Sequence, residues 1–143
     1  MNKKPYIIDF PKIGEASLGY ISIAEGQNLP FTPKRIYWTY FTPEDVERGG
    51  HAHLELEQIL VSVAGKVELK IETIDGMVFN FVLDSPNRGV YIPKRSWRTM
   101  KYTHNAVQMC IASIAYDEKD YIREYNEFLI FRNRFETTSN SKK

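Results

Sequence analysis

Short stretches rich in β-branched and aromatic residues recur along almost the whole chain, and this pattern limits the fold more than any other feature. The clearest stretch is Val67–Glu72, where three apolar residues alternate with three charged ones. A period of two residues is the pattern of a strand with one buried face. The dipeptide Asp75-Gly76 follows and precedes another β-rich run, as expected for a tight hairpin. The chain is therefore predicted to contain at least one amphipathic β-hairpin.

Several further stretches have the same composition, dense in valine, isoleucine, tyrosine, phenylalanine and tryptophan. Such residues suit the pleated, half-buried surface of a sheet. We therefore expect additional strands at residues 6–10, 18–24, 34–41, 51–63, 77–83, 89–92 and 107–115. Many short strands with turn residues between them are typical of a β-sandwich or a β-barrel.

Residues 117–129 are the one segment with the pattern of a helix. This segment opens with acidic residues, which favour a helix N-terminus, and it places Tyr121 and other aromatic or apolar side chains on one face. A chain of 143 residues fits one domain, and no linker divides it. We expect a single domain over residues 1–135 and a disordered tail over residues 136–143.

The composition disfavours several kinds of partner. The 19 basic and 18 acidic residues nearly cancel, so no extended basic surface for nucleic acid is predicted. No apolar run approaches the roughly 20 residues of a membrane-spanning helix, and no signal-peptide pattern opens the chain. These features predict a cytoplasmic protein that binds neither nucleic acid nor membrane. The one cysteine, Cys110, lies in an apolar run and is expected to be a buried core residue.

The residues with the clearest chemical potential lie in the segment Glu47-Arg-Gly-Gly-His-Ala-His53. Residues two apart in a strand point to the same face, so His51 and His53 project together with their Cα atoms about 7 Å apart. The glycines before them allow close approach of the backbone, and Arg48 adds a fixed positive charge. Two histidines alone are compatible with a structural role, but this context favours a functional site.

A metal centre is the first function to test against this pattern. The pair His51 and His53, followed by Gly65, resembles the first cupin motif, whose ligands are two histidines and a carboxylate. Counting back from Gly65 places Gln58 at the carboxylate position, and Arg98 stands where the fourth ligand is expected. A guanidinium keeps its proton and does not coordinate cations.

We therefore predict no metal and no cofactor. Weak metal binding by the two histidines, with help from Glu57, is the alternative. Two imidazoles without a metal suit acid–base catalysis near neutral pH.

The wider sequence around these residues is similar to the dTDP-4-keto-6-deoxyglucose 3,4-ketoisomerases. The similar segments are Arg35–Tyr40, Arg48–His53, Leu56–Val61 with Gly65, Leu83–Pro86, Gly89–Tyr91, Trp97 and Tyr116–Tyr125. The resemblance spans the chain from about Pro33 to Phe128. Two positions depart from the family pattern: Arg98, where some relatives have a histidine, and Gly50, where an aromatic residue is frequent.

The resemblance implies an all-β fold, a cupin-type double-stranded β-helix or jelly-roll barrel with one C-terminal helix. It implies an isomerase that moves the carbonyl from C4 to C3 of a dTDP-linked 6-deoxyhexose, for the biosynthesis of dideoxy amino sugars. A base removes the C3 proton, an enediol or enediolate forms, and a proton is delivered to C4. His51 is then the candidate base and His53 the candidate partner that moves protons between the two oxygens. The spacing alone does not distinguish this order from the reverse.

The same resemblance gives candidates for the remaining contacts. Tyr37 and Arg48 are candidates for holding the developing oxyanion. The candidate substrate-binding residues are Arg35, Tyr40, Trp97 and Arg98, with Arg98 toward the diphosphate. Tyr37 and Tyr40 have opposite strand parity, so at most one of them is expected to face the barrel unless a bulge intervenes. Trp97 is more typical of a core residue than of a platform for the nucleobase.

Members of this family are homodimers, often with N-terminal strands exchanged between subunits. Residues 6–10 form a short apolar strand near the terminus, set apart by Pro11 and Gly14. An exposed strand edge of this kind is best paired with another chain. We therefore expect a homodimer in which this strand is exchanged.

Three other functions are compatible with the pattern: a 3,5-epimerase of the same fold, a non-catalytic sugar-binding cupin and a metal-dependent cupin dioxygenase. The order of the motifs favours the ketoisomerase over the epimerase. A sugar-sensing cupin usually accompanies a helix-turn-helix, and one predicted helix does not supply it. Gln58 and Arg98 disfavour the dioxygenase.

Overall fold

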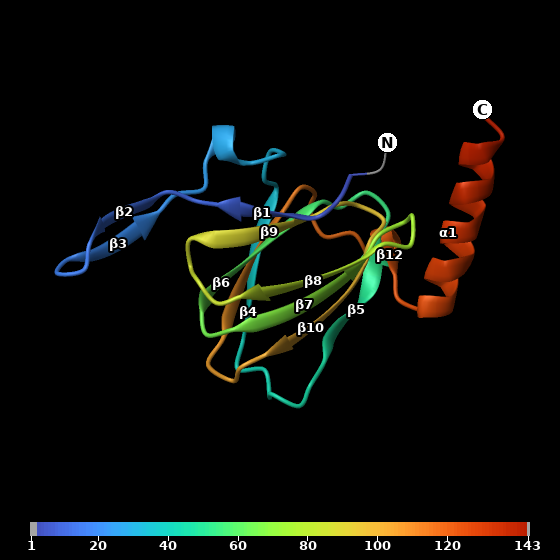
Figure 1. The fold of residues 1–143 in the computed structure, drawn as a ribbon. Coiled ribbons are helices and arrows are strands. Elements are labelled where there is room, and N and C mark those ends of the chain that lie inside the picture. The colour runs from blue at the N-terminus through green and yellow to red at the C-terminus, as the bar shows by residue number, and fades with distance from the viewer. Residues whose placement is uncertain (1–2, 143) are drawn as a thin grey trace.

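Two five-stranded antiparallel sheets face each other in the computed structural model, which describes residues 3–142 (Figure 1). The first sheet has the order β1 (Tyr6–Asp9), β9 (Arg88–Ile92), β6 (Gln58–Ala64), β11 (Val107–Ala112) and β4 (Arg35–Tyr40). The second has the order β12 (Tyr121–Ile122), β5 (Arg48–His53), β10 (Trp97–Tyr102), β7 (Val67–Glu72) and β8 (Val78–Leu83). This arrangement confirms the predicted cupin-type barrel with one C-terminal helix.

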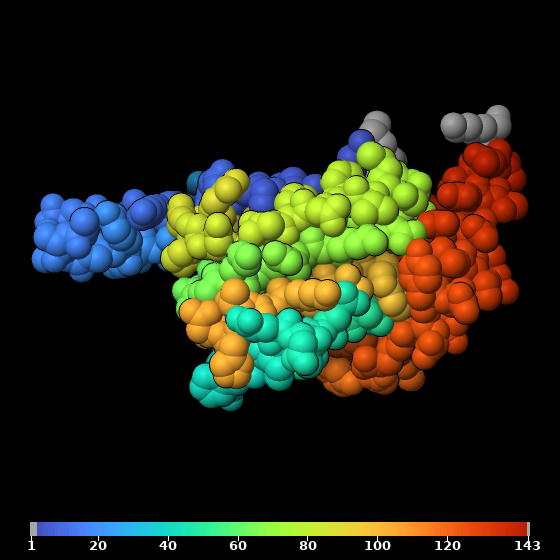
Figure 2. Space-filling view, turned by 60° about the horizontal axis from the view of Figure 1, so that its bottom comes forward, coloured from blue at the N-terminus to red at the C-terminus, as the bar shows by residue number. Residues whose placement is uncertain are grey.

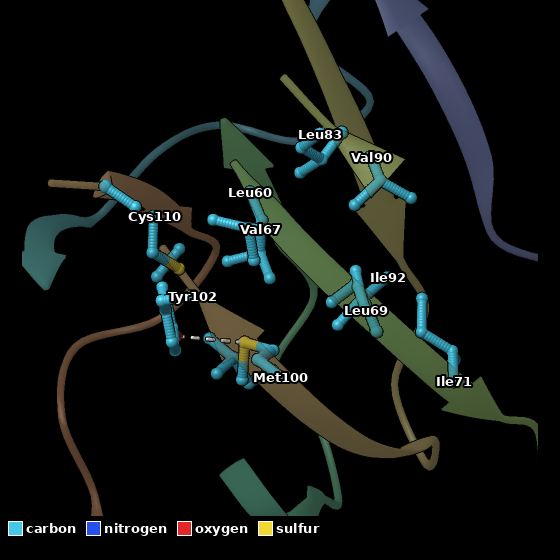
Figure 3. Close-up of a cluster of buried hydrophobic side chains, with 13 residues drawn as sticks. Leu60, Val67, Leu69, Ile71, Leu83, Val90, Ile92, Met100, Tyr102 and Cys110 are labelled. Atoms are coloured by element: carbon cyan, nitrogen blue, oxygen red, sulfur yellow. Dashed lines mark hydrogen bonds between the residues drawn. The ribbon is translucent and has the colours of Figure 1, made fainter. Parts of the chain in front are cut away.

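The hydrophobic core lies between the inner faces of the two sheets. Figure 3 shows side chains from both sheets meeting there, among them Leu60 and Cys110 from the first and Leu69 from the second. In β7 the apolar residues that alternate in the sequence are the buried ones: Val67, Leu69 and Ile71 are at most 2% exposed. The predicted hairpin joins β7 to β8, with Gly76 at a positive φ of 80°.

One strand prediction was wrong in detail, and strand β10 was missed. The stretch 51–63, expected as one strand, is divided into β5 and β6 by a loop over residues 54–57. The loop forms because two of its backbone N–H groups donate to the carboxylate of Asp120 instead of continuing the sheet. Strand β10 was not predicted, because Arg98 interrupts its apolar pattern although the residue is completely buried.

The predicted helix over 117–129 begins later than expected. Asp117 accepts a hydrogen bond from the backbone N–H of Lys119 and caps a single 3-10 turn, η2 (Glu118–Asp120). The next residues form β12 on the edge of β5, and the helix α1 runs over Tyr125–Asn140. The acidic run therefore begins a turn rather than a helix.

The tail predicted as disordered from residue 136 is helical through Asn140. Three hydroxyl side chains in this last part, those of Thr137, Thr138 and Ser139, donate to carbonyls four residues earlier. Residue 143 lies outside the described part of the chain. The helix packs on the second sheet through Phe128, which is buried against Ala52 and Ile122. No helix in residues 3–142 has the length and apolar character needed to cross a membrane.

A hairpin of β2 (Lys12–Glu15) and β3 (Gly19–Ser22) projects from the barrel at the end opposite α1 (Figures 1 and 2). All eight of its strand residues are exposed. A 3-10 turn, η1 (Gly26–Asn28), follows it. The strand that we expected to be exchanged between subunits, β1, pairs with β9 of the same chain. The segment that leaves the barrel is thus the hairpin and not β1.

A β-bulge at the glycine pair before the histidines sets their direction. The register between β10 and β5 shifts between Arg98, which pairs with His51, and Thr99, which pairs with Gly49, so Gly50 is the extra residue. Gly49 and Gly50 have φ values of 82° and 65°, which side-chain-bearing residues rarely adopt. A Cβ at Gly49 would lie 2.7 Å from the carbonyl oxygen of Arg98, whereas at Gly50 it would meet open space.

We predict that Gly49→Ala destabilises the protein much more than Gly50→Ala. Both substitutions incur the cost of a positive φ, about 1–2 kcal/mol. At Gly49 the contact with the β10 backbone adds about 1–3 kcal/mol. Urea unfolding of the two variants measures the difference, and equal losses of stability would contradict the bulge geometry.

Candidate active site

Strand β5 brings both histidines to the inner face of the barrel. His51 and His53 alternate with Ala52, which is fully buried on the opposite face against α1. The two imidazole rings meet edge to face with their centroids 4.9 Å apart. The common face predicted for the His-Ala-His segment is therefore present in the structure.

Arg98 lies directly across from His51 in the β5–β10 pairing, so both side chains point inward. The residue is completely buried, and its Nη1 donates to Oε1 of Gln58 at 2.5 Å. Its Nε and Nη2 atoms have no hydrogen-bond partner among the described residues. Burial lowers the pKa of Arg98 to about 10, which still leaves it charged at neutral pH. The interior thus contains a permanent cation with two unused donors.

Gln58 connects Arg98 to Tyr37 on the opposite sheet. Its Nε2 donates to the Tyr37 hydroxyl at 2.9 Å. Burial of the hydroxyl end raises the pKa of Tyr37, so this group remains a neutral phenol. Cys110, the register partner of Tyr37, is 1% exposed, and burial raises the pKa of its thiol to about 11. Its prediction as a buried core residue is confirmed.

The positions of the third and fourth cupin ligands are held by Gln58 and Arg98, and these two side chains bond each other. Among residues 3–142, no three histidine, cysteine or carboxylate side chains gather in a way that would hold a metal ion. The site offers a metal two imidazoles beside a guanidinium, a poor donor set for a divalent cation.

Both histidines are neutral at physiological pH. Burial, followed by the charge of Arg98, lowers the pKa of His51 to about 4. The same two causes lower the pKa of His53. Each ring is therefore available to accept a proton from a bound molecule.

Aromatic and cationic side chains surround the histidines toward the surface. Tyr121, on β12, is the register partner of His53, with the two ring centroids 4.3 Å apart. The guanidinium of Arg123 lies 4.0 Å above the Tyr121 ring and forms two hydrogen bonds with Glu118. Arg35 lies over the ring of Tyr37, at 5.2 Å, and also contacts the ring of Tyr116. This rim of cations and rings suits an anionic ligand with flat groups.

Two of these neighbours of the histidines, Asp120 and Tyr121, were missed by sequence analysis. Oδ2 of Asp120 lies 3.1 Å from Nδ1 of His53. Both residues belong to the segment predicted as a helix, where they were assigned to helical positions. The adjacent aromatic and β-branched residues Tyr121 and Ile122 were the available signal for a strand.

The predicted residues fall into two groups. His51, His53, Tyr37, Arg35 and Arg98 converge on one end of the barrel interior, as their shared parity and register require.

Three predicted site residues do not join them. Tyr40 is 55% exposed on the outer face of β4, as the parity argument required if Tyr37 faces inward. Trp97 points away from the histidines, and its ring packs against Tyr125 and Phe128 of α1. Since Arg98 occupies the inner face, its neighbour in the strand must point outward. Arg48 is exposed before the bulge, with no hydrogen bond or ion pair to either histidine among the described residues.

The fold and the site together define the class of this protein, a cupin-type barrel that encloses two imidazoles beside a buried arginine. The chain belongs to the FdtA family, described as WxcM-like, C-terminal, which matches residues 3–133. This confirms the resemblance found in the sequence.

Similar proteins support that placement. The chain is 38% identical over 124 residues, 85% of this chain and 88% of the relative, to the TDP-4-oxo-6-deoxy-α-D-glucose-3,4-oxoisomerase of Aneurinibacillus thermoaerophilus. The solved structure of a 3,4-ketoisomerase from Helicobacter canadensis is 36% identical, with a TM-score of 0.84 over 90% of this chain and 97% of the other. The sugar 3,4-ketoisomerase QdtA from Thermoanaerobacterium thermosaccharolyticum, in complex with TDP, is 32% identical, with a TM-score of 0.86 over 94% of this chain and 98% of the other.

An epimerase shares only the fold. NovW, a 4-keto-6-deoxy sugar epimerase from Streptomyces spheroides, is 14% identical to this chain, with a TM-score of 0.69. The comparisons therefore favour the ketoisomerase over the epimerase.

Proposed function

We propose that this protein is a sugar-nucleotide 3,4-ketoisomerase that converts dTDP-4-keto-6-deoxy-D-glucose to a dTDP-3-keto-6-deoxyhexose. The main support for the proposal is that His51, His53 and the unused donors of Arg98 lie together inside one barrel. Its relatives named above are 3,4-ketoisomerases, and a QdtA variant was crystallised with TDP-4-keto-6-deoxyglucose.

The reaction needs a base, a carrier of protons between oxygens and a stabiliser of negative charge. We assign His51 as the base that removes the proton from C3, which leaves an enediolate with its charge on O4. His53 takes the proton from the O3 hydroxyl and gives it to O4, so the charge moves to O3. The protonated His51 then returns its proton to C4, and O3 becomes the new carbonyl. Proton transfers of this kind by positioned imidazoles typically contribute about 10²–10⁴ in rate.

We assign Arg98 to the enediolate rather than to the diphosphate, where the sequence analysis expected it. The residue has no exposed surface, so the group it meets is one that enters the barrel, such as the sugar ring. Its Nε and Nη2 donors would face the developing negative charge in a site of low dielectric, where such contacts are strongest. The Tyr37 hydroxyl, held by Gln58, is the second candidate donor.

The nucleotide would lie along the rim. Arg35 has an unpaired, buried Nε and lies over two tyrosine rings, which suits a diphosphate beside a base. Arg123 supplies a second cation at the same opening. We propose a cytoplasmic location for the reaction, consistent with a lone, buried cysteine.

The proposal is tested by incubating the protein with dTDP-4-keto-6-deoxyglucose in deuterated water, with EDTA present, and following the sugar by NMR. We expect conversion to the 3-keto sugar with deuterium incorporated at carbon. His51→Asn should lower kcat about 10²–10⁴-fold with a much smaller change in KM, because the nucleotide contacts remain. His53→Asn should cause a smaller loss, since a water can relay a proton between oxygens.

Two outcomes would contradict the proposal. If the wild-type protein does not convert the substrate unless zinc or iron is added, the metal-free mechanism is wrong. If His51→Asn exchanges the C3 proton at the wild-type rate, another group is the base.

We also propose that the protein is a homodimer in which the β2–β3 hairpin lies on the partner subunit. The hairpin exposes Ile13, Leu18 and Ile21, which are 55%, 84% and 66% accessible. An exposed apolar hairpin of this size is an unusual feature for a monomer. A cavity of about 340 Å³ beside it, on the outer face of the first sheet, is lined by Phe10, Tyr20, Val63, Met109 and Ile111 among others.

The double substitution Ile13→Lys with Ile21→Lys should therefore convert the dimer to a monomer. Val78→Lys with Val82→Lys is the matched control, because these β8 residues are 51% and 54% exposed and lie on the barrel instead. Light scattering at micromolar concentration measures the mass. A monomeric wild-type protein would refute the dimer.

A further inference from the structure

We propose that Asp120 is a positioning residue for the reaction, which holds His53 as the tautomer protonated on Nδ1 and so leaves Nε2 free to accept a substrate proton. The inference rests on the proposed function, in which His53 carries a proton between two oxygens. It adds a residue that sequence analysis assigned to a helix.

The carboxylate of Asp120 is buried and surrounded by donors. The residue is 7% exposed. Its Oδ1 accepts the backbone N–H of Glu55 at 2.7 Å, and its Oδ2 accepts that of Leu56 at 3.2 Å. The same Oδ2 lies 3.1 Å from Nδ1 of His53. An ionised carboxylate can only accept hydrogen bonds, so Nδ1 must be the atom that carries the proton.

This contact determines what the other side of the imidazole can do. With Nδ1 protonated, the neutral ring has its lone pair on Nε2, which has no hydrogen bond to the described residues. The ring lies against His51 and Tyr121 at the inner face of the barrel. Proton transfer by His53 needs this lone pair, because the ring must accept the hydroxyl proton before it gives a proton to the other oxygen.

Asp120 also supplies the negative charge that a protonated His53 requires. The nearby cations are Arg98 on β10, Arg35 on β4 and Arg123 after β12, and all three disfavour an imidazolium. Asp120 is the anion in direct contact with the ring. Its carboxylate therefore stabilises the transient imidazolium at the moment of proton transfer.

Replacement of Asp120 by asparagine tests whether Asp120 sets the tautomer of His53 or only packs beside it. An asparagine side chain has one acceptor oxygen, and the shortest bond, from Glu55 N–H, is expected to take it. The amide nitrogen then replaces Oδ2, so the Leu56 N–H loses its acceptor. The amide nitrogen then faces His53 and donates to Nδ1, which forces the proton onto Nε2. That tautomer has no lone pair toward the substrate, so kcat should fall about 10²–10⁴-fold while KM changes little.

The matched control is Asp117→Asn. Asp117 caps the same 3-10 turn by accepting the Lys119 N–H at 3.0 Å, and no described contact links it to His53. This variant removes the charge that caps the turn without removing the Asp120 carboxylate from the imidazole. We expect it to keep the wild-type kcat and the wild-type tautomer.

The test uses ¹⁵N-histidine labelling and long-range ¹H–¹⁵N NMR spectra of the full chain. With three histidines in the sequence, His53 is assigned by its loss in His53→Asn. The wild-type protein and Asp117→Asn should show His53 protonated on Nδ1, and Asp120→Asn should show it protonated on Nε2 together with the loss of kcat. Even if Asp120→Asn does not fold, the wild-type spectrum shows which nitrogen of His53 carries the proton.

Two results would overturn the inference: a wild-type His53 protonated on Nε2, or a folded Asp120→Asn with wild-type kcat. Failure of the proposed function is a different result. In that case wild-type protein would not isomerise dTDP-4-keto-6-deoxyglucose, yet its His53 would still show the tautomer set by Asp120.

Discussion

The structure is organised around one buried charge, the guanidinium of Arg98. Removing a cation from water costs several kcal/mol unless partners satisfy it, and here one bonded partner is the neutral amide of Gln58. A protein keeps such a group only where other contacts compensate or where the charge is used. Burial, together with the charge of Arg98, keeps the neighbouring histidines neutral. Arg98 also holds the Gln58 amide, which is oriented toward Tyr37, and it keeps two donors for a ligand. Arg98 and its burial therefore set much of the electrostatics around the two histidines.

The backbone around Arg98 is adapted to place His51 beside it. The bulge at Gly50 allows the chain to re-enter the sheet with His51 opposite Arg98, and Gly49 lies so close to the Arg98 carbonyl that a side chain would collide with it. On the other side of β5, the short strand β12 adds Tyr121 beside His53, while Asp120 ends the turn before it. Residues far apart in sequence are thus held by backbone pairing rather than by flexible loops, which is the arrangement that precise proton transfer requires.

The sequence predicted those parts of the site that follow strand periodicity. The common face of His51 and His53 and the opposite faces of Tyr37 and Tyr40 are consequences of a period of two. Asp120 could not be found in this way, because four acidic or polar residues in a row are equally typical of a helix N-terminus, and its contact with His53 joins residues 67 apart. Trp97 and Arg98 could not be placed from hydrophobicity. Hydrophobicity alone suggests a tryptophan inside the barrel and an exposed arginine, whereas the structure buries Arg98 inside and packs Trp97 against α1.

The proposed role of Arg98 in stabilising the enediolate inside the barrel is tested most directly by the kcat of Arg98→Met. Methionine has a similar volume and no charge, so the variant is expected to fold, since replacing a buried charge by an apolar side chain is often tolerated. With folding verified by its thermal melt, kcat for the isomerisation should fall on the order of 10²–10³-fold, the usual effect of removing an oxyanion donor. A folded Arg98→Met with wild-type kcat would contradict the account.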